Sequence, residues 1–160
     1  MKTIVVKERE TLLIHQLVSV WEASVKETHL FLSEEEISEI KKYVPDAIKK
    51  VPQLIVLEDK PKHPIAFMGV DGKRLEMLFI TPEERGKGLG KYLIRHALEL
   101  YSIQELTVNE QNPLAKGFYE HMGFKVYKRS EQDEEGNPYP LLYMKRDNDA
   151  ERVFLNCNNM

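Results

Sequence analysis

The stretch FITPEERGKGLGKYLIRHAL, residues 79–98, decides the fold. An apolar run leads into three alternating glycines, Gly86, Gly88 and Gly90, and apolar residues at helical spacing follow them. Glycine lacks the side chain that would keep a ligand away from the backbone, and successive N–H groups at a helix start create a concavity of positive potential. We therefore expect a strand, a phosphate-binding loop and a helix, in this order.

The loop also carries the positive charges of Arg85, Lys87 and Lys91. A single glycine would favour a tight turn that only allows a helix to pack on a sheet, but three alternating glycines with basic neighbours favour an anion site. Two nucleotide-binding patterns fit poorly. A Walker loop needs Ser or Thr where this chain has Tyr92, and the dinucleotide pattern G-x-G-x-x-G is replaced by G-x-G-x-G.

The composition is that of a soluble globular chain, since 42% of the 160 residues are hydrophobic and 31% are charged. The net charge of −3 and the pI of about 6.0 argue against a nucleic-acid partner. No apolar run approaches the ~20 residues of a membrane span. Cys157 is the only cysteine, which excludes a disulfide framework and a cysteine metal site. We expect a cytoplasmic protein without membrane or nucleic-acid partners.

The N-terminal part predicts a short edge strand over residues 3–6 and two helices. Apolar residues recur at helical spacing between residues 10 and 25. Ser33 is a candidate N-cap for the second helix, because Glu36 follows three residues later and can complete a capping box. We expect Pro45 to end this second helix.

Strands and short connections follow. Residues 53–58 and 64–70 predict an antiparallel hairpin with a loop of about five residues, and the Asp71-Gly72 turn leads to a third strand. After the glycine loop and its helix, residues 105–109 predict a strand. A short helix then begins at Asn112 and ends at Gly123, and two closing strands, FKVYKR and YPLLYMK, complete the pattern.

This order favours one mixed sheet with helices on both faces. Only residues 75–109 have the strand–loop–helix–strand order of a parallel pair. We expect one domain over residues 1–146 and a C-terminal tail over residues 147–160. The RVFL stretch of this tail is a candidate for an added strand or for contact with a second subunit in a homodimer.

The glycine loop resembles the signature [QR]-x-x-G-x-[GA] of the GNAT (GCN5-related) N-acetyltransferase family, which residues 85–90 fit in full. Residues 109–124, NEQNPLAKGFYEHMGF, are similar to the family pattern N-x-x-A-x-x-F-Y-x-x-x-G-F. The segments SVKETHLFLS and RSEQDEEGNPYPLL resemble a bacterial, YjaB-like subgroup. The resemblance covers about residues 3–146. It implies an α/β (α+β) acyl-CoA N-acyltransferase fold, with a central mixed β-sheet of about seven strands, four helices on both faces and a splay between strands 4 and 5.

The same resemblance implies acetyl-CoA as cosubstrate and no metal. The diphosphate would lie on the amides of the loop, and the pantetheine arm would run between the strands at 75–80 and 105–109. Backbone N–H groups near Phe79 and Ile80 would polarise the thioester carbonyl. The implied donor-binding residues are Leu78, Phe79, Ile80, Arg85, Gly86, Lys87, Gly88, Leu89, Gly90, Lys91, Asn112 and Tyr119.

Tyr119 is implied to be the general acid that protonates the departing thiolate. A phenol with a pKa near ~10 stays protonated at neutral pH and can donate as charge develops on sulfur. The alternative is an aromatic side chain that only packs at the edge of an apolar helix face. Asn112 is most simply an N-cap, and the resemblance adds a hydrogen bond to pantetheine.

Glu76 is the candidate for the group that accepts the proton of the amine. Strand alternation puts it on one face with Leu78 and Ile80, and apolar neighbours would raise the pKa of its carboxyl group. An equally weighted alternative is a glutamate at the sheet end that pairs with Arg74. A water chain is a third route for the proton, in which case Glu76 binds the acceptor.

The resemblance also implies that the connection between the first two helices covers the acceptor site. His29 and Trp21 are therefore candidate substrate contacts, together with Asn109 at the end of its strand. A histidine in a helix connection is more often a capping or surface residue, so both interpretations stay open. The other histidines have no spacing typical of a metal site.

The leading hypothesis is an enzyme that transfers an acetyl group from acetyl-CoA to a primary amine by direct attack in a ternary complex. The acceptor is either a small-molecule amine or a protein N-terminus or lysine. The alternative is a non-catalytic module that binds and senses acyl-CoA. Steady release of free thiol in the presence of an amine would separate the two hypotheses.

Overall fold

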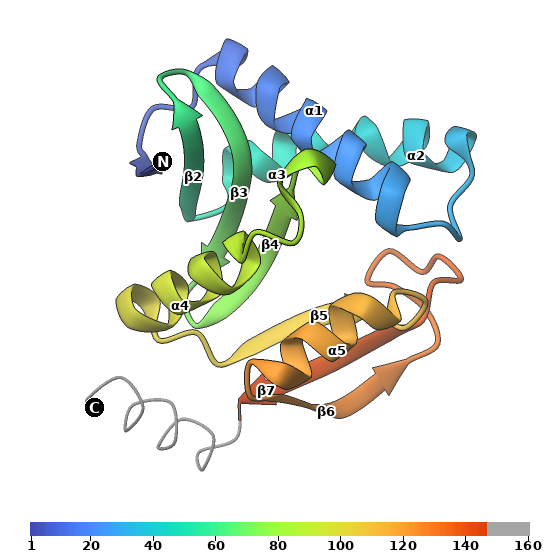
Figure 1. Cartoon of the computed structure of the whole chain (residues 1–160). Helices are drawn as coiled ribbons and strands as arrows, with labels where there is room; N and C mark the ends of the chain where they lie inside the picture. The colour runs from blue at the N-terminus through green and yellow to red at the C-terminus, as the bar shows by residue number, and fades with distance from the viewer. Residues whose placement is uncertain (147–160) are drawn as a thin grey trace. The chain divides into compact units, whose positions relative to one another are not determined.

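The computed structural model describes residues 1–146. The chain forms two compact units, Met1–Ile103 and a second unit that begins at Gln104. In Figure 1 the first unit runs from blue to yellow and the second from yellow to red. The expected tail at 147–160, with its RVFL stretch, lies outside the described residues.

The sheet of the first unit is an antiparallel meander of four strands. Its order is β1 (Lys2–Val6), β2 (Gln53–Lys60), β3 (His63–Asp71) and β4 (Arg74–Ile80). The expected turn between β3 and β4 is confirmed, and its Gly72 has a φ of +60°, a conformation that side chains disfavour.

The hairpin between β2 and β3 is tighter than the sequence predicts. The polar run 59–63 was expected to be a loop, but only Pro61 and Lys62 stand between the two strands. A register shift after Glu58 lets the outer residues continue the pairing, and His63 Nδ1 lies 2.5 Å from Asp59 Oδ1. Polar residues are no barrier to pairing here because the end of the hairpin is exposed to solvent.

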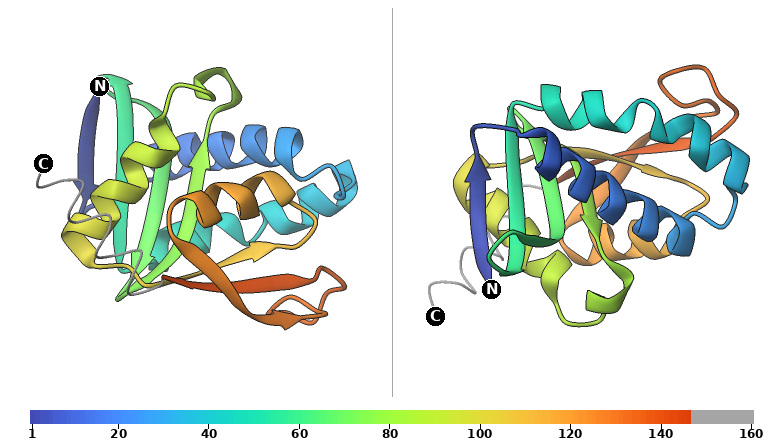
Figure 2. Two further views of the ribbon diagram at one scale, coloured as in Figure 1. Left: turned by 60° about the horizontal axis from the view of Figure 1, so that its bottom comes forward. Right: turned by 90° about the horizontal axis from the view of Figure 1, so that it is seen from above.

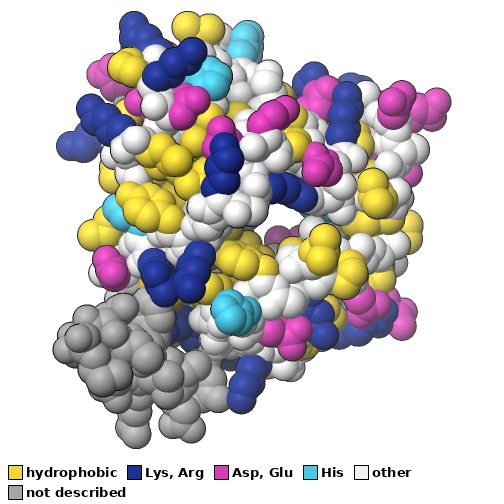
Figure 3. Space-filling model, in the orientation of Figure 1, with side chains coloured by type: hydrophobic (Ala, Val, Ile, Leu, Met, Phe, Trp, Pro, Cys, Tyr) yellow, Lys and Arg dark blue, Asp and Glu magenta, His cyan; other side chains and the backbone are white. Residues whose placement is uncertain are grey.

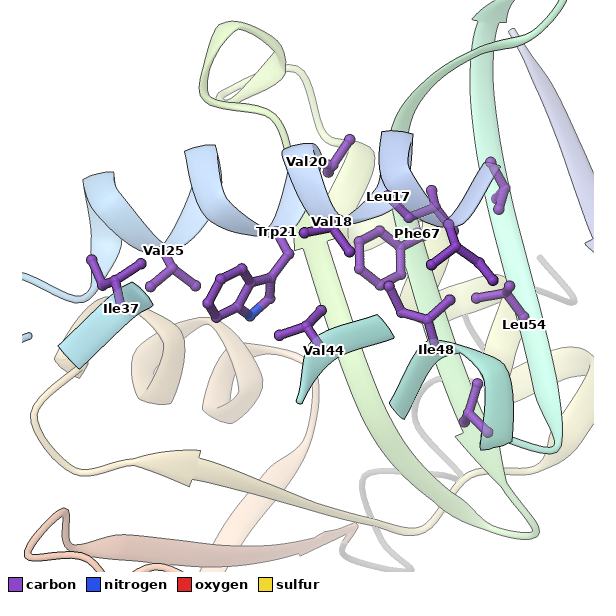
Figure 4. Close-up of a cluster of buried hydrophobic side chains, with 13 residues drawn as sticks. Leu17, Val18, Val20, Trp21, Val25, Ile37, Val44, Ile48, Leu54 and Phe67 are labelled. Carbon is purple, nitrogen blue, oxygen red and sulfur yellow. The ribbon is translucent and has the colours of Figure 1, made fainter. Parts of the chain in front are cut away.

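One face of this sheet is covered by α1 (Thr11–Thr28), α2 (Glu34–Lys41) and α3 (Val44–Lys50). Figure 4 shows apolar side chains from these three helices, β2 and β3 meeting in one cluster. Leu17, Ile48, Leu54 and Phe67 are fully buried in it. Burying an aliphatic or aromatic side chain of this size contributes about 1.5–3 kcal/mol, so this cluster anchors α1 on the sheet.

The start of α2 confirms the predicted capping box. Ser33 Oγ accepts a hydrogen bond of 3.1 Å from the N–H of Glu36, and Glu36 Oε1 accepts one of 3.1 Å from the N–H of Ser33. The predicted end of this helix is wrong. α2 stops at Lys41, and Pro45 lies in the first turn of a further helix. Proline is tolerated there because the first N–H groups of a helix have no partner within it.

An ion-pair cluster on the surface links α1 to α2. Glu22 lies 2.5 Å from Nζ of Lys41 and 3.1 Å from Nζ of Lys26. Hydrogen bonds from Lys41 and Lys26 lower the pKa of the Glu22 carboxyl group. Figure 3 shows acidic and basic side chains interspersed over these two helices.

The opposite face of the four-stranded sheet is covered by α4 (Leu89–Tyr101), which contacts β3 and β4. Figure 2 shows α4 and α1 on the two sides of the strands. Leu93, Ile94 and Ala97 form the fully buried stripe of α4. The helix ends at Tyr101, and Ser102 follows it in a left-handed conformation.

Over residues 104–146, the second unit is a three-stranded antiparallel sheet with one helix. β7 (Leu141–Arg146) lies between β5 (Glu105–Asn109) and β6 (Phe124–Ser130). The helix α5 (Pro113–His121) contacts β5 and β6. The predicted elements of this unit are confirmed, including the stop at Gly123, whose φ is +97°.

Candidate active site

The glycine loop joins the short 3₁₀ helix η1 (Pro82–Glu84) to α4. Gly86 and Gly88 have φ angles of +76° and +79°, which residues with a Cβ rarely adopt. A Cβ added at either position would meet no atom within 4 Å. These two glycines are therefore needed for the backbone conformation, and tight packing of the helix on the sheet does not explain them.

The first turn of α4 is open to an anion. Gly88 is the N-cap and has no side chain with which to cap the helix. The N–H groups of the first helical residues, from Leu89 onward, have no partner within a helix and carry its positive dipole end. Gly86, Lys87 and Gly88 are exposed, so a ligand can reach the loop backbone from solvent. This geometry suits a phosphate group.

The charge of the loop is smaller than the sequence suggests. Lys87 lies 3.0 Å from Oε2 of Glu84, its neighbour in η1, so part of its charge is already compensated. Arg85 and Lys91 are exposed. Two of the three expected cations therefore face solvent at the loop, and the third is shared with a carboxylate.

The end of β4 leads into this loop. Leu78, Phe79 and Ile80 are half-buried. The ring of Phe79 packs against the core that α1 covers, 5.5 Å from the ring of Phe67. The N–H of Thr81 donates to the carbonyl of Ile65 at 2.9 Å, which ties the strand end to β3. The donor-binding role of these residues stays a prediction.

Glu76 does not have the apolar surroundings that its proposed role as a base required. Its carboxylate is exposed, and Oε1 lies 3.1 Å from Nε of Arg74. The ion pair with Arg74 matches the alternative that the sequence leaves open for Glu76.

Tyr119 is the buried aromatic residue of α5. Its ring lies 5.1 Å from that of Phe118 and 6.2 Å from that of Phe124. Burial raises the pKa of the Tyr119 hydroxyl above its ordinary value. The phenol therefore stays protonated at neutral pH. This protonated state fits a hydrogen-bond donor, and it equally fits a side chain that only packs in the core.

The polar residues before α5 hold its first turn. Asn112 Oδ1 accepts a hydrogen bond of 3.2 Å from the N–H of Ala115, which confirms the predicted N-cap. Asn109 is half-buried, and its carbonyl accepts from the N–H of Asn112 at 3.0 Å. Glu110 pairs with Arg129 through two contacts of 2.5 and 3.1 Å, which lowers the pKa of Glu110. A ligand role for Asn109 and Asn112 stays a prediction.

Trp21 and His29 lie in different surroundings. Trp21 is only 6% exposed and belongs to the core cluster between α1, α2 and α3, where Figure 4 labels it. This burial argues against its predicted contact with a substrate. His29 is half-buried at the C-terminal end of α1, and its Nδ1 lies 2.8 Å from Thr28 Oγ1. The spacing of Ser24 and Thr28, four residues apart on α1, could have indicated this polar end of the helix.

Within residues 1–146, no group of three or more His, Cys, Asp or Glu side chains is placed to hold a metal ion. None of the helices in this part of the chain is long and apolar enough to cross a membrane.

Comparison with known proteins identifies the family. Residues 28–145 match the acetyltransferase (GNAT) domain. Peptidyl-lysine N-acetyltransferase YjaB of Salmonella typhimurium is 44% identical over 127 residues, which are 79% of this chain and 87% of that protein. The solution structure of apo YjaB from Escherichia coli superposes with a TM-score of 0.80 at 39% identity, over 91% of this chain and 97% of that one.

A more distant structure shows the same fold. The PaiA N-acetyltransferase of Thermoplasma acidophilum, solved in complex with coenzyme A, is 22% identical with a TM-score of 0.64, over 91% of this chain and 99% of that one. The predicted fold class is thereby confirmed. The chain belongs to the GNAT family and is an N-acetyltransferase.

Proposed function

We propose that this enzyme transfers the acetyl group of acetyl-CoA to the ε-amine of lysine residues in proteins. The glycine loop carries the proposal, because its two left-handed glycines leave an uncapped helix start open to a diphosphate. The coenzyme A in the Thermoplasma acidophilum relative supports the donor. The name of the Salmonella typhimurium relative, peptidyl-lysine N-acetyltransferase, supports lysine as the acceptor.

The diphosphate would accept hydrogen bonds from the amides of residues 86–90. Arg85 and Lys91 would supply the positive charge that faces solvent. Lys87 would have to share its ammonium group between the ligand and Glu84. Backbone amides then contribute most of the selectivity, because their directions are fixed by the loop and those of the lysine side chains are not.

The chemical step needs no covalent enzyme intermediate. The neutral amine attacks the carbonyl carbon of the thioester, the C–N bond forms, and the C–S bond breaks. One proton leaves the nitrogen, and one reaches the sulfur of coenzyme A. Tyr119 is the proposed donor of the second proton.

The raised pKa of Tyr119 refines this role. A thiol has a pKa of about 8.5, so the phenol is the weaker acid and keeps its proton in the resting enzyme. It would hydrogen-bond to sulfur and yield the proton as negative charge develops in the transition state. Burial among Phe118 and Phe124 holds the ring in one place for this purpose.

A direct assay tests the proposal. The purified chain is incubated with acetyl-CoA and a lysine peptide whose N-terminus is blocked, and free thiol and peptide mass are followed. The matched control is the same peptide with an Nε-acetylated lysine. We expect thiol release and one added acetyl group only with the free lysine.

Other outcomes separate the alternatives. Turnover with spermidine-like small amines but with no peptide would overturn the protein acceptor and keep the acetyl transfer. Binding of acetyl-CoA without thiol release on any amine would instead support a module that senses acyl-CoA.

A further inference from the structure

The side chain and backbone of His29 are held in place from three directions. Its N–H donates to the carbonyl of Val25 at 2.8 Å, and its carbonyl accepts from the N–H of Leu32 at 2.9 Å. Its ring nitrogen Nδ1 lies 2.8 Å from Thr28 Oγ1. An imidazole fixed in this way has a defined orientation, which a surface histidine does not need.

The neighbouring hydroxyl group determines which ring nitrogen carries the proton. Thr28 Oγ1 donates its single proton to the carbonyl of Ser24 at 2.7 Å. The hydroxyl can therefore only accept from His29, so Nδ1 must be the protonated nitrogen. In the neutral ring the lone pair is then on Nε2, and this nitrogen is the one that can take up a proton.

The surroundings keep this ring neutral. His29 is half-buried and its ring lies 5.4 Å from that of Phe31. Desolvation by burial, followed by the positive charge of Arg85, lowers the pKa of His29. Arg85 is in the glycine loop, and α1 packs against η1, the element that leads into this loop. The imidazole thus lies within electrostatic range of the proposed donor site.

The carboxylates of α1 and η1 do not offset the influence of Arg85 on the pKa of His29. On α1, Glu22 is paired with Lys26 and Lys41, and on η1, Glu84 is paired with Lys87. Glu27 and Glu83 are exposed to solvent, where water screens their charge. Arg85 is therefore the charged side chain whose field is felt at His29.

We propose that Nε2 of His29 is the general base of the acetyl transfer. The proposal rests on the proposed function above. As the amine attacks the thioester carbon, its nitrogen becomes positively charged and its remaining N–H bonds become acidic. Nε2 takes one of these protons and becomes imidazolium, while the departing sulfur receives a proton from Tyr119. The imidazolium then returns its proton to solvent and the Tyr119 phenolate takes one up, which restores both groups for the next turnover.

Kinetics of a matched pair of variants test this role. His29→Gln removes the basic nitrogen, and His15→Gln changes an exposed histidine on the same helix. With a lysine peptide, we expect His29→Gln to lower kcat by about 100-fold or more, with an unchanged Kd for coenzyme A. The inflection that reports imidazole ionisation should vanish from its pH–rate profile, while His15→Gln should behave as the wild type.

A measurement on the wild-type protein covers the case in which His29→Gln fails to fold. Nitrogen chemical shifts of the histidine ring distinguish the two neutral tautomers, and we expect the Nδ1–H form at His29. The Nε2–H form would overturn the proposal, as would full activity of His29→Gln. A wild-type chain that turns over no amine would overturn the proposed function itself, and the two failures are therefore distinguishable.

Discussion

Arg74 and Glu76 form an ion pair along β4, with Nε of the guanidinium 3.1 Å from Oε1 of the carboxylate. Both side chains belong to the same strand, and the register with β3 shifts at Glu76, because Gly69 pairs with Met77 and Val70 pairs with Leu75. The carboxylate is exposed. The carboxylate therefore has a cationic partner on its own strand.

The pair leads to a prediction for Glu76→Gln. We expect less than about a tenfold change in kcat/KM, and we expect the rising limb of the pH–rate profile to stay in place, because the proposed base is His29 and Glu76 is paired with Arg74. Initial rates with a lysine peptide between pH 6 and pH 9 measure both quantities. A flattened limb would return the base role to Glu76 and contradict the assignment to His29.

Gly88→Trp should abolish donor binding. The left-handed φ of +79° strains any side chain, and an indole would fill the open space above the helix start. We expect the affinity for coenzyme A in calorimetry to fall by at least about 100-fold, or about 2.7 kcal/mol. Gly136→Trp is the matched control, because Gly136 also has a left-handed φ (+83°) and open space around it, in the turn before β7. Equal losses in both variants would mean that strain alone is being measured.

Tyr119→Phe should separate catalysis from binding. The change removes one hydroxyl and keeps the ring that packs against Phe118 and Phe124. We expect kcat to fall by about 100-fold or more with an unchanged Kd for coenzyme A. Tyr127→Phe, at an exposed position of β6, controls for the loss of a phenol. Normal turnover of Tyr119→Phe would reduce Tyr119 to a packing residue.

The same residue predicts how stability depends on alkaline pH. Burial raises the pKa of Tyr119 in the folded state, whereas the unfolded chain releases this proton at the ordinary phenol pKa of about 10. Above this pH the unfolded state binds fewer protons, so the free energy of unfolding falls as pH rises. The stability present below pH ~10 is lost progressively above it, and Tyr119→Phe should lose less. Urea titrations of both proteins from pH 8 to pH 11 measure the difference, and parallel curves would contradict the burial of the hydroxyl.

Local sequence signals predicted the features that depend on a few neighbouring residues. The glycine loop and both caps are of this kind, because Ser33 bonds to Glu36 and Asn112 bonds to Ala115, each three residues away. The φ angles of Gly86 and Gly88 likewise follow from the lack of a side chain. In these patterns the residues that cause the structure lie close together in the sequence, so the sequence alone predicts the feature.

Features that depend on distant partners were missed or misjudged. Pro45 lies in the first turn of a separate helix, α3, because the core accepts Val44 and Ile48 from that helix. The burial of Trp21 depends on residues of α2 and α3 that lie far along the chain, so its substrate contact stays a prediction. The orientation of His29 depends on how the hydroxyl of Thr28 uses its one proton. The spacing of residues along the chain does not reveal which acceptor receives the proton of this hydroxyl group.

The contact between Lys87 and Glu84 has a consequence for how the donor arrives. Two glutamates, Glu83 and Glu84, stand directly before the cations of the loop, so the attraction that this segment exerts over long distances is weak. Long-range steering by a strongly positive patch makes association rates fall steeply with ionic strength. Capture of the nucleotide here should therefore depend less on added salt than capture by a strongly positive patch.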